Sequence, residues 1–188
     1  MVFHDQKESP KYDNKPTKEM FRVGEHMKIA LVSDTHGHCK GLADSIKKHQ
    51  AEYILHMGDG VTEAYQLKKE TGLPTLVVAG NNDFSTKEKA ELFLVLEGIA
   101  IWMTHGHRYG VHYGREQLLE AAMQKEAKIA LYGHTHIFRD ECMEGIRMIN
   151  PGSPTLPRDG EASYAILDLS SGKLDRIKVE KPKLFHWF

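Results

Sequence analysis

The chain has 188 residues, 40% of them hydrophobic, which is enough for one domain with a buried core and too few for two comfortable ones. With 25 basic and 26 acidic residues its formal net charge is −1, so we expect neither nucleic acid nor a membrane as a partner. The sequence contains no apolar run of the roughly 18 residues that span a bilayer, no apolar segment typical of a signal peptide in residues 1–26, and no CxxC pair. These features predict a cytoplasmic protein.

Residues 1–26 differ in character from the rest of the chain. They are polar and charged, contain Pro10 and Pro16, and show no hydrophobic periodicity. We predict that residues 1–26 form a mobile polar extension and that residues 27–188 form a single domain.

In the first half of that domain, short apolar runs alternate with amphipathic segments. The pattern predicts strands over 28–33, 52–57 and 75–80, and helices over 40–49 and 61–72. A β-α-β-α-β order implies parallel strands joined by right-handed crossovers.

The second half is richer in predicted strands. Residues 90–98 and 99–105 read as a hairpin around Gly98, and residues 115–127 as an amphipathic helix. A buried strand over 128–133 is followed by four segments that we predict to be antiparallel strands: 136–145, 146–153, 162–169 and 173–180. This order predicts an α/β fold in which two mixed β-sheets pack as a sandwich flanked by helices.

Polar side chains follow five of the apolar runs directly. In open α/β sheets, ligands bind beside the carboxyl ends of the strands, and all five clusters are predicted to lie at such ends. Each cluster alone is more typical of a turn or of a hydrogen-bonded core histidine, but together they indicate one site. The clusters are Asp34 with His36; Asp59; Asn81 with Asn82 and Asp83; His105 with His107; and His134 with His136.

Backbone geometry at these clusters is also predicted from the sequence. Asp34 and His36 are two residues apart, so an extended backbone would turn both side chains to the same side. The same holds for His105 with His107 and for His134 with His136. Four glycines beside the clusters would allow sharp turns. These are Gly58, Gly80, Gly106 and Gly133.

The combination of Asp, His and Asn without cysteine suits Mn²⁺, Fe, Zn or a similar ion in a reactive site rather than a structural zinc site. The candidate ligands outnumber what one ion requires. Two ions that share a carboxylate would use them, at the roughly 3.5–4 Å separation of two-metal hydrolytic sites.

Six motifs, "SDTHG", "GDG", "GNND", "THGH", "GHTH" and "INPGS", occur in this order. In them the sequence resembles the calcineurin-like metallophosphoesterases, and most closely their small single-domain prokaryotic branch, the YfcE-like phosphodiesterases. The resemblance covers residues 28 to about 180 and implies the αββα metallophosphoesterase sandwich, in agreement with the predicted elements.

The resemblance also implies a set of metal ligands. One ion would be held by Asp34, His36 and His136, the other by Asn81, His105 and His134, and Asp59 would bridge the two. The cofactors would be two divalent metal ions, Mn²⁺ first and Fe, Ni or Zn as alternatives.

The chemistry implied by the resemblance is hydrolysis of a small phosphodiester substrate by attack of a metal-bridging hydroxide. His107 and His38 would lie on the phosphate side or around the ligands, and Asp83 would orient neighbouring groups. Asn82 stands where the wider superfamily usually has a histidine. Its amide can donate a hydrogen bond to a phosphoryl oxygen but cannot supply a proton near neutral pH.

Alternatives come from other classes of protein. A retromer subunit with this fold is a protein-binding scaffold with a degraded metal site, whereas all seven ligand positions here hold residues able to bind metal. A phosphomonoesterase or phosphoprotein phosphatase is a second alternative, although the chain lacks long insertions that would form a protein-substrate groove. Substrate specificity would reside in rim loops such as "HRYGVHYGRE" and "PTLPRDGE". The aromatic tail "LFHWF" is expected to pack either on the domain itself or on a second subunit, which would make a homodimer.

Overall fold

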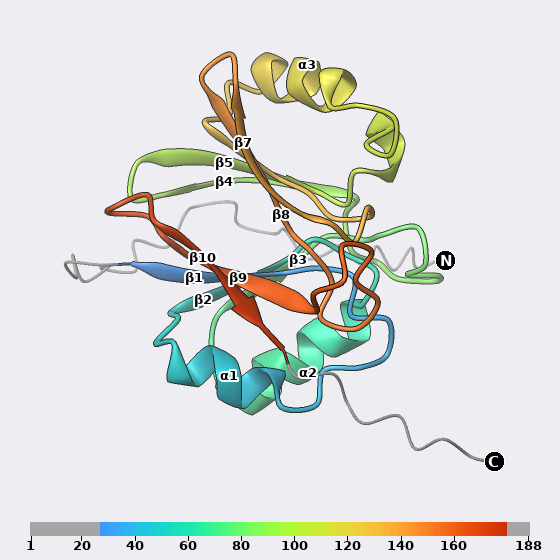
Figure 1. The fold of residues 1–188 in the computed structure, drawn as a ribbon, viewed down its shortest axis with the longest axis vertical. Coiled ribbons are helices and arrows are strands. Elements are labelled where there is room, and N and C mark those ends of the chain that lie inside the picture. The colour runs from blue at the N-terminus through green and yellow to red at the C-terminus, as the bar shows by residue number, and fades with distance from the viewer. Residues whose placement is uncertain (1–26, 180–188) are drawn as a thin grey trace, which may run out of the picture.

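The computed structural model describes residues 27–179, which form two five-stranded sheets facing each other with helices outside (Figure 1). The predicted extension, residues 1–26, and the tail "LFHWF" lie outside the described residues. The elements in chain order are β1 (Lys28–Val32), α1 (Leu42–Lys48), β2 (Tyr53–His56), α2 (Val61–Thr71), β3 (Thr75–Val77), β4 (Glu91–Leu96), β5 (Ile99–Thr104), the 3₁₀ helix η1 (His107–Tyr109), α3 (Glu116–Gln124), β6 (Ile129–Leu131), β7 (Phe138–Met143), β8 (Ile146–Pro151), β9 (Ser163–Asp168) and β10 (Leu174–Lys178).

The first sheet has the strand order β10-β9-β1-β2-β3. Strands β1, β2 and β3 are parallel, as the β-α-β-α-β pattern predicts, and β9 closes one side antiparallel to β1. Helices α1 and α2 cover the outer face of this sheet (Figure 1). Helix α2 ends at Gly72, whose left-handed φ of 75° lets its N–H bond the Lys68 carbonyl.

The second sheet has the order β4-β5-β6-β8-β7. The predicted hairpin of β4 and β5 turns through Glu97 and Gly98, both with positive φ, as a two-residue turn of right-twisted strands requires. The predicted antiparallel pairing is present between β7 and β8, between β1 and β9 and between β9 and β10. Strand β8 lies between β7 and β6 and also pairs with β6, to which it is parallel, so the sheet is mixed as predicted.

Three apolar layers hold the sandwich together. Ile29 and Leu31 of β1 point between the two sheets, whereas Ala30 and Val32 face α1 and α2, so both faces of this strand are buried. On the far side α3 packs Leu118 and its neighbours against the outer face of the second sheet (Figure 1). Each fully buried aliphatic side chain contributes about 1.5–3 kcal/mol. The predicted helix-flanked sandwich is confirmed.

This topology brings the carboxyl ends of the parallel strands of both sheets to one edge. Backbone hydrogen bonds join the loops there, from the Asp34 N–H to the Gly58 carbonyl (3.0 Å) and from the Gly133 N–H to the His105 carbonyl (3.1 Å). In the described part of the chain, no helix has the length and apolar character needed to cross a membrane.

Candidate metal centre

The seven predicted ligands lie just beyond the ends of β1, β2, β3, β5 and β6. The structure brings five of them into two groups whose potential ligand atoms lie within 4.8 Å of one another. Asp34 belongs to both groups, which therefore form one centre. The groups are Asp34, His36 and His136, and Asp34, Asp59 and His105.

In the first group, two ring nitrogens and a carboxylate oxygen converge. His136 Nε2 lies 3.2 Å from His36 Nε2 and 3.3 Å from Asp34 Oδ1. His136 Nδ1 is 2.7 Å from the Leu156 carbonyl and must donate to it, because a carbonyl can only accept. In the neutral ring, Nε2 therefore presents its lone pair to a carboxylate, an arrangement that needs a cation or a proton between the two.

The second group repeats this arrangement. His105 Nε2 lies 3.1 Å from Asn81 Oδ1 and 3.4 Å from Asp59 Oδ2, while His105 Nδ1 donates to the Met57 carbonyl at 2.7 Å. The same Asp59 oxygen is 3.8 Å from His36 Nε2. One oxygen of Asp59 thus faces histidines of both groups, which is the place that a bridging ligand would occupy.

Asp34 is completely buried, and its two oxygens have different surroundings. Oδ2 accepts hydrogen bonds from the Ser33 hydroxyl (2.6 Å) and the His134 N–H (3.0 Å). Oδ1 has no hydrogen-bond partner among the described residues. Burial raises the pKa of Asp34, but His136 and His105 outweigh burial and the net pKa is lowered. A buried, ionised oxygen without a donor is costly unless a cation binds it, so the residues fit the metal ions that the resemblance implies.

His134 lies beside these groups without a nitrogen in either of them. Its ring centroid is 5.1 Å from that of His105 and 4.4 Å from that of His112. Burial and the positive charges of His105 and His112 lower the pKa of His134 to about 4. The ring is therefore neutral at pH 7, the form that binds metal.

Asp83 and Asn82 act on Asp59 and its loop. The Asp83 carboxylate accepts four backbone N–H bonds of 2.7–2.9 Å, from Asp59, Gly60, Val61 and Gly80. The backbone N–H and side-chain amide of Asn82 both donate to Asp59. Asp83 thus holds the loops after β2 and β3 together, and Asn82 orients the carboxylate of Asp59.

The other two predicted catalytic histidines differ in exposure. His107 is half-buried in η1, 5.4 Å from His105 between ring centroids, and its Nδ1 has no hydrogen-bond partner among the described residues. Burial lowers the pKa of His107, and His105 and Arg108 lower it further. His38 is exposed and donates from Nδ1 to the His36 carbonyl at 3.1 Å.

The predicted extended backbone is wrong at all three pairs. Asp34 and His36 are left-handed, with φ of 56° and 43°, as are His134 and His136, with φ of 67° and 59°. His107 lies in the 3₁₀ helix η1. Turns rather than strands orient these side chains. Gly58 and Gly106 have the positive φ expected of sharp turns, but Gly80 and Gly133 do not. At Gly80 a Cβ would lie 2.1 Å from Asp59 Oδ1, so close approach explains that glycine.

Sequence reasoning missed three residues that shape the centre. Asn150 Nδ2 donates to the Gly133 carbonyl at 2.7 Å, and Ser153 Oγ donates to the Asp34 carbonyl at 2.7 Å. Both belong to "INPGS", where polar residues at the end of an apolar strand were an available signal. His112 lies in a polar rim loop away from any strand end, where no pattern distinguishes it.

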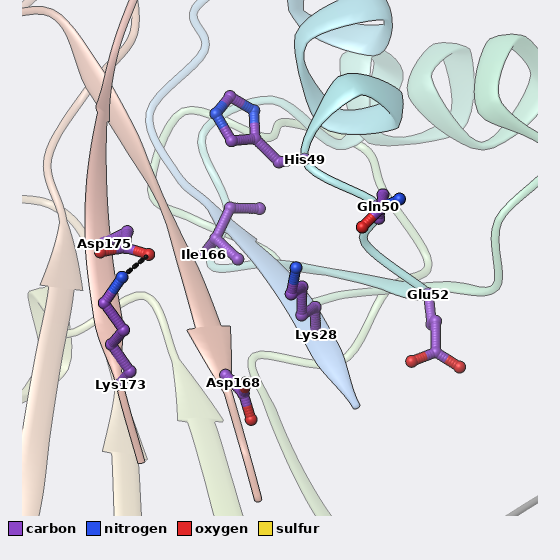
Figure 2. A pocket seen from close by; sticks show the side chains of 8 residues that line it. All are labelled: Lys28, His49, Gln50, Glu52, Ile166, Asp168, Lys173 and Asp175. Carbon is purple, nitrogen blue, oxygen red and sulfur yellow. Dashed lines mark hydrogen bonds and ion pairs between the residues drawn. The ribbon is translucent and has the colours of Figure 1, made fainter. Parts of the chain in front are cut away.

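A cavity of about 540 Å³ lies at the other end of β1 (Figure 2). Lysines and carboxylates of mixed charge line it, among them Lys28, Glu52 and Lys173, which is paired with Asp175 at 2.9 Å. None of the predicted ligands borders this cavity. The convergent ligand atoms, rather than the hollow surface, mark the candidate site.

Comparisons with known proteins agree with this geometry. Residues 27–172 match the family described as the calcineurin-like phosphoesterase superfamily domain. The chain belongs to this superfamily.

Particular relatives place the chain among small metallophosphoesterases. It is 37% identical over 148 residues to "Probable metallophosphoesterase YsnB" of Bacillus subtilis, covering 77% of this chain and 86% of that protein. It is 27% identical over 168 residues to "Phosphodiesterase YfcE" of Escherichia coli K12, covering 76% of this chain and 88% of that protein. The resemblance to the YfcE-like branch is confirmed.

Solved structures show the same fold. A predicted phosphoesterase from Streptococcus pneumoniae TIGR4 superposes with a TM-score of 0.71 at 27% identity, over 85% of this chain and 95% of that one. A Vps29 mutant from Entamoeba histolytica superposes with a TM-score of 0.66 at 22% identity, over 82% of this chain and 100% of that one. At that identity the likeness to Vps29 concerns the fold alone.

Proposed function

We propose that this protein is a phosphodiesterase that uses two divalent metal ions to hydrolyse small phosphodiesters. The proposal rests on hydrogen-bond acceptors that face each other. The Nε2 atoms of His136 and His105 lie against the carboxylates of Asp34 and Asp59, while their Nδ1 atoms donate to backbone carbonyls. These ligand atoms form a set that is suited to bind cations.

When bound, two such ions polarise a phosphoryl group and make a hydroxide available near neutral pH for in-line attack. The residues of the chain hold and orient the predicted metal ligands. The Met57 and Leu156 carbonyls fix the tautomers of His105 and His136, and Asn82 fixes the carboxylate of Asp59. We assign Mn²⁺ first, because carboxylate and amide oxygens suit it, with Fe, Ni or Zn as alternatives that the imidazole ligands also suit.

The preference for diesters over monoesters rests on a relative that carries the name phosphodiesterase. The preference for activated esters rests on Asn82, which offers no proton to a leaving group near neutral pH. A substrate with an acidic leaving group does not require that proton. We therefore assign activated diesters as the best substrates.

The test compares bis(4-nitrophenyl) phosphate with 4-nitrophenyl phosphate, which release the same chromophore. Each is assayed with Mn²⁺, Fe²⁺, Ni²⁺, Zn²⁺ or a chelator. The proposal predicts turnover that requires metal and a higher kcat/KM for the diester. A higher value for the monoester would contradict diester specificity, and no turnover with any metal would contradict the enzyme.

The scaffold alternative shares the fold, as the likeness to Vps29 shows. All seven ligand positions here keep residues that can bind metal, and this observation favours the enzyme. A partner protein that binds this chain with unchanged affinity after metal removal, together with absent turnover, would favour the scaffold.

A further inference from the structure

The loop that follows β8 is tied to the metal centre at several points. Ser153 donates to the Asp34 carbonyl, and the Leu156 carbonyl accepts from His136 Nδ1. The Arg158 N–H donates to the His136 carbonyl at 3.0 Å. The backbone of Arg158 is therefore held one hydrogen bond away from a predicted ligand.

The charge of Arg158 is not used by the fold. Its acidic neighbour Asp159 is committed elsewhere, to Arg176 at 2.8 Å and to the Phe138 N–H at 3.0 Å. Within residues 27–179, Arg158 makes no ion pair and its side chain is exposed. An arginine whose backbone is fixed and whose guanidinium group is exposed is suited to bind an anion from solution.

The backbone hydrogen bond to His136 keeps the exposed side chain of Arg158 at the edge of the first ligand group, which contains His136. The rim loop "HRYGVHYGRE" also reaches the centre, where the ring of His112 lies 4.4 Å from that of His134 between centroids. Arg158 thus belongs to a loop that borders the centre without supplying one of its predicted ligands.

We propose, on the basis of the proposed function, that Arg158 binds a second anionic group of the substrate. The preferred substrates are then phosphodiesters that carry a further phosphate or carboxylate beyond the ester under attack. The scissile phosphoryl would be bound by metal ions at the two ligand groups. A planar guanidinium can form bidentate hydrogen bonds with the oxygens of a separate oxyanion.

The test uses two substrates that differ only in that group: thymidine 5′-(4-nitrophenyl phosphate) with and without a 3′-phosphate. Both release 4-nitrophenolate. In the natural protein loaded with Mn²⁺, the 3′-phosphate should lower KM by about three- to tenfold, and less at high salt because the contact is exposed. Arg158→Gln should bring the ratio of the two KM values to about one, and Arg158→Lys should keep part of it.

Arg139 on β7 supplies the matched control, since it too has no ion pair within the described residues and lies outside the ligand groups. Arg139→Gln should keep the natural KM ratio. A ratio of one in the natural protein would overturn the proposal. So would an equal loss on both substrates in Arg158→Gln, because that result would place Arg158 on the scissile phosphoryl.

A binding measurement separates this proposal from the proposed function. Calorimetry of the Mn²⁺-loaded protein compares thymidine 5′-phosphate with thymidine 3′,5′-bisphosphate. Tighter binding of the bisphosphate that is lost in Arg158→Gln supports the anion site even if neither ester is hydrolysed, a result that would reject only the phosphodiesterase. Hydrolysis of both esters with no difference in binding would reject the anion site and leave the phosphodiesterase intact.

Discussion

Unusual backbone conformations gather at individual ligands of the centre. Five of the seven predicted ligands are non-glycine residues with φ between 43° and 67°, in the left-handed region: Asp34, His36, Asp59, His134 and His136. Such a residue costs on the order of 1 kcal/mol and persists only where its surroundings enforce it. Here the enforcement is visible, because the His36 N–H bonds the Asp59 carbonyl at 3.1 Å. The fold holds these residues in place to aim their side chains.

Asn82 leads to a prediction about leaving groups. Its side chain holds Asp59 and offers no titratable proton, and positioned proton transfer typically contributes about 10²–10⁴-fold. We expect kcat/KM for a series of aryl and alkyl diesters to fall steeply as the leaving-group pKa rises. Asn82→His should flatten this dependence where its ring reaches the departing oxygen. A flat series in the natural protein that becomes steep in His107→Ala or His38→Ala would show that one of those histidines is the acid.

His56 leads to a prediction about pH and stability. It is fully buried, accepts a hydrogen bond from the Gly58 N–H, and burial lowers its pKa to about 4. In the unfolded chain its pKa is about 6.5, so the unfolded state binds the proton first as the pH falls. The free energy of unfolding should therefore be unaffected by His56 above pH 6.5 and fall below it, by about 2 kcal/mol at pH 5.

Urea unfolding of the metal-free protein at pH 7.5 and pH 5.0 measures this loss. His56→Gln removes the titrating group, so the variant should lose less stability between the two pH values than the natural protein. An identical loss in both proteins would show that other groups carry the acid sensitivity.

Among the secondary-structure elements, the strand ends that carry the predicted ligands approach each other closely. Gly133, at the end of β6, lies against β1 so tightly that a Cβ would be 1.9 Å from Ser33 Oγ and 2.8 Å from Asp34 Oδ2. Its φ is not in the left-handed region, so the constraint is space alone.

Gly133→Ala should therefore displace Asp34. We expect a loss of about 1–3 kcal/mol in the free energy of unfolding, as for other overpacked sites, and at least about tenfold weaker Mn²⁺ binding by calorimetry. Gly114→Ala is the control, because the three atoms nearest to its Cβ belong to the flexible carboxylate end of the Glu116 side chain. Adding Ser33→Ala should restore part of the loss. Natural metal affinity in Gly133→Ala would contradict the close-approach account.

Hydrophobic patterning predicts the elements well because the strands are short, apolar and bounded by polar loops. Hydrophobic patterning does not predict features that depend on tertiary contacts, such as where a strand ends or which strand it joins. Strand β3 ends at Val77 rather than at residue 80, because Ala79 leaves the sheet to bond Lys89 and carries Asn81 toward the centre. The direction of β8 depends on which strand it joins. Aspartate and histidine adopt the left-handed region more often than most residues, but this preference is too weak to locate such turns from the sequence. The ligands themselves can be predicted, because their side chains bind metal and they follow the ends of apolar strands.

At the scale of the whole molecule, the two sheets share the centre. The first sheet supplies Asp34, His36, Asp59 and Asn81. The second supplies His105, His134 and His136. Each ligand group contains residues from both sheets, so correct packing of the sandwich is a condition for metal binding.

All the proposed chemistry lies within the part of the chain that matches the superfamily, residues 27–172. A chain that starts at Met27 should therefore keep metal-dependent hydrolysis of bis(4-nitrophenyl) phosphate within about twofold of the full chain. Circular dichroism of both chains verifies folding. Loss of turnover in a folded shortened chain would assign residues 1–26 a catalytic role.

Our proposal that two ions share the Asp59 carboxylate is tested by counting the bound metal ions. Mn²⁺ per chain is measured after loading and removal of excess, together with turnover, for the natural protein, for Asp59→Asn and for Asp44→Asn, which changes an exposed residue of α1. We expect two ions per chain in the natural protein and in Asp44→Asn. In Asp59→Asn we expect one ion or none and turnover reduced by at least about 10²-fold, since a shared charge is lost from both ions. Two ions and near-natural turnover in Asp59→Asn would show that Asp59 is not shared by two ions.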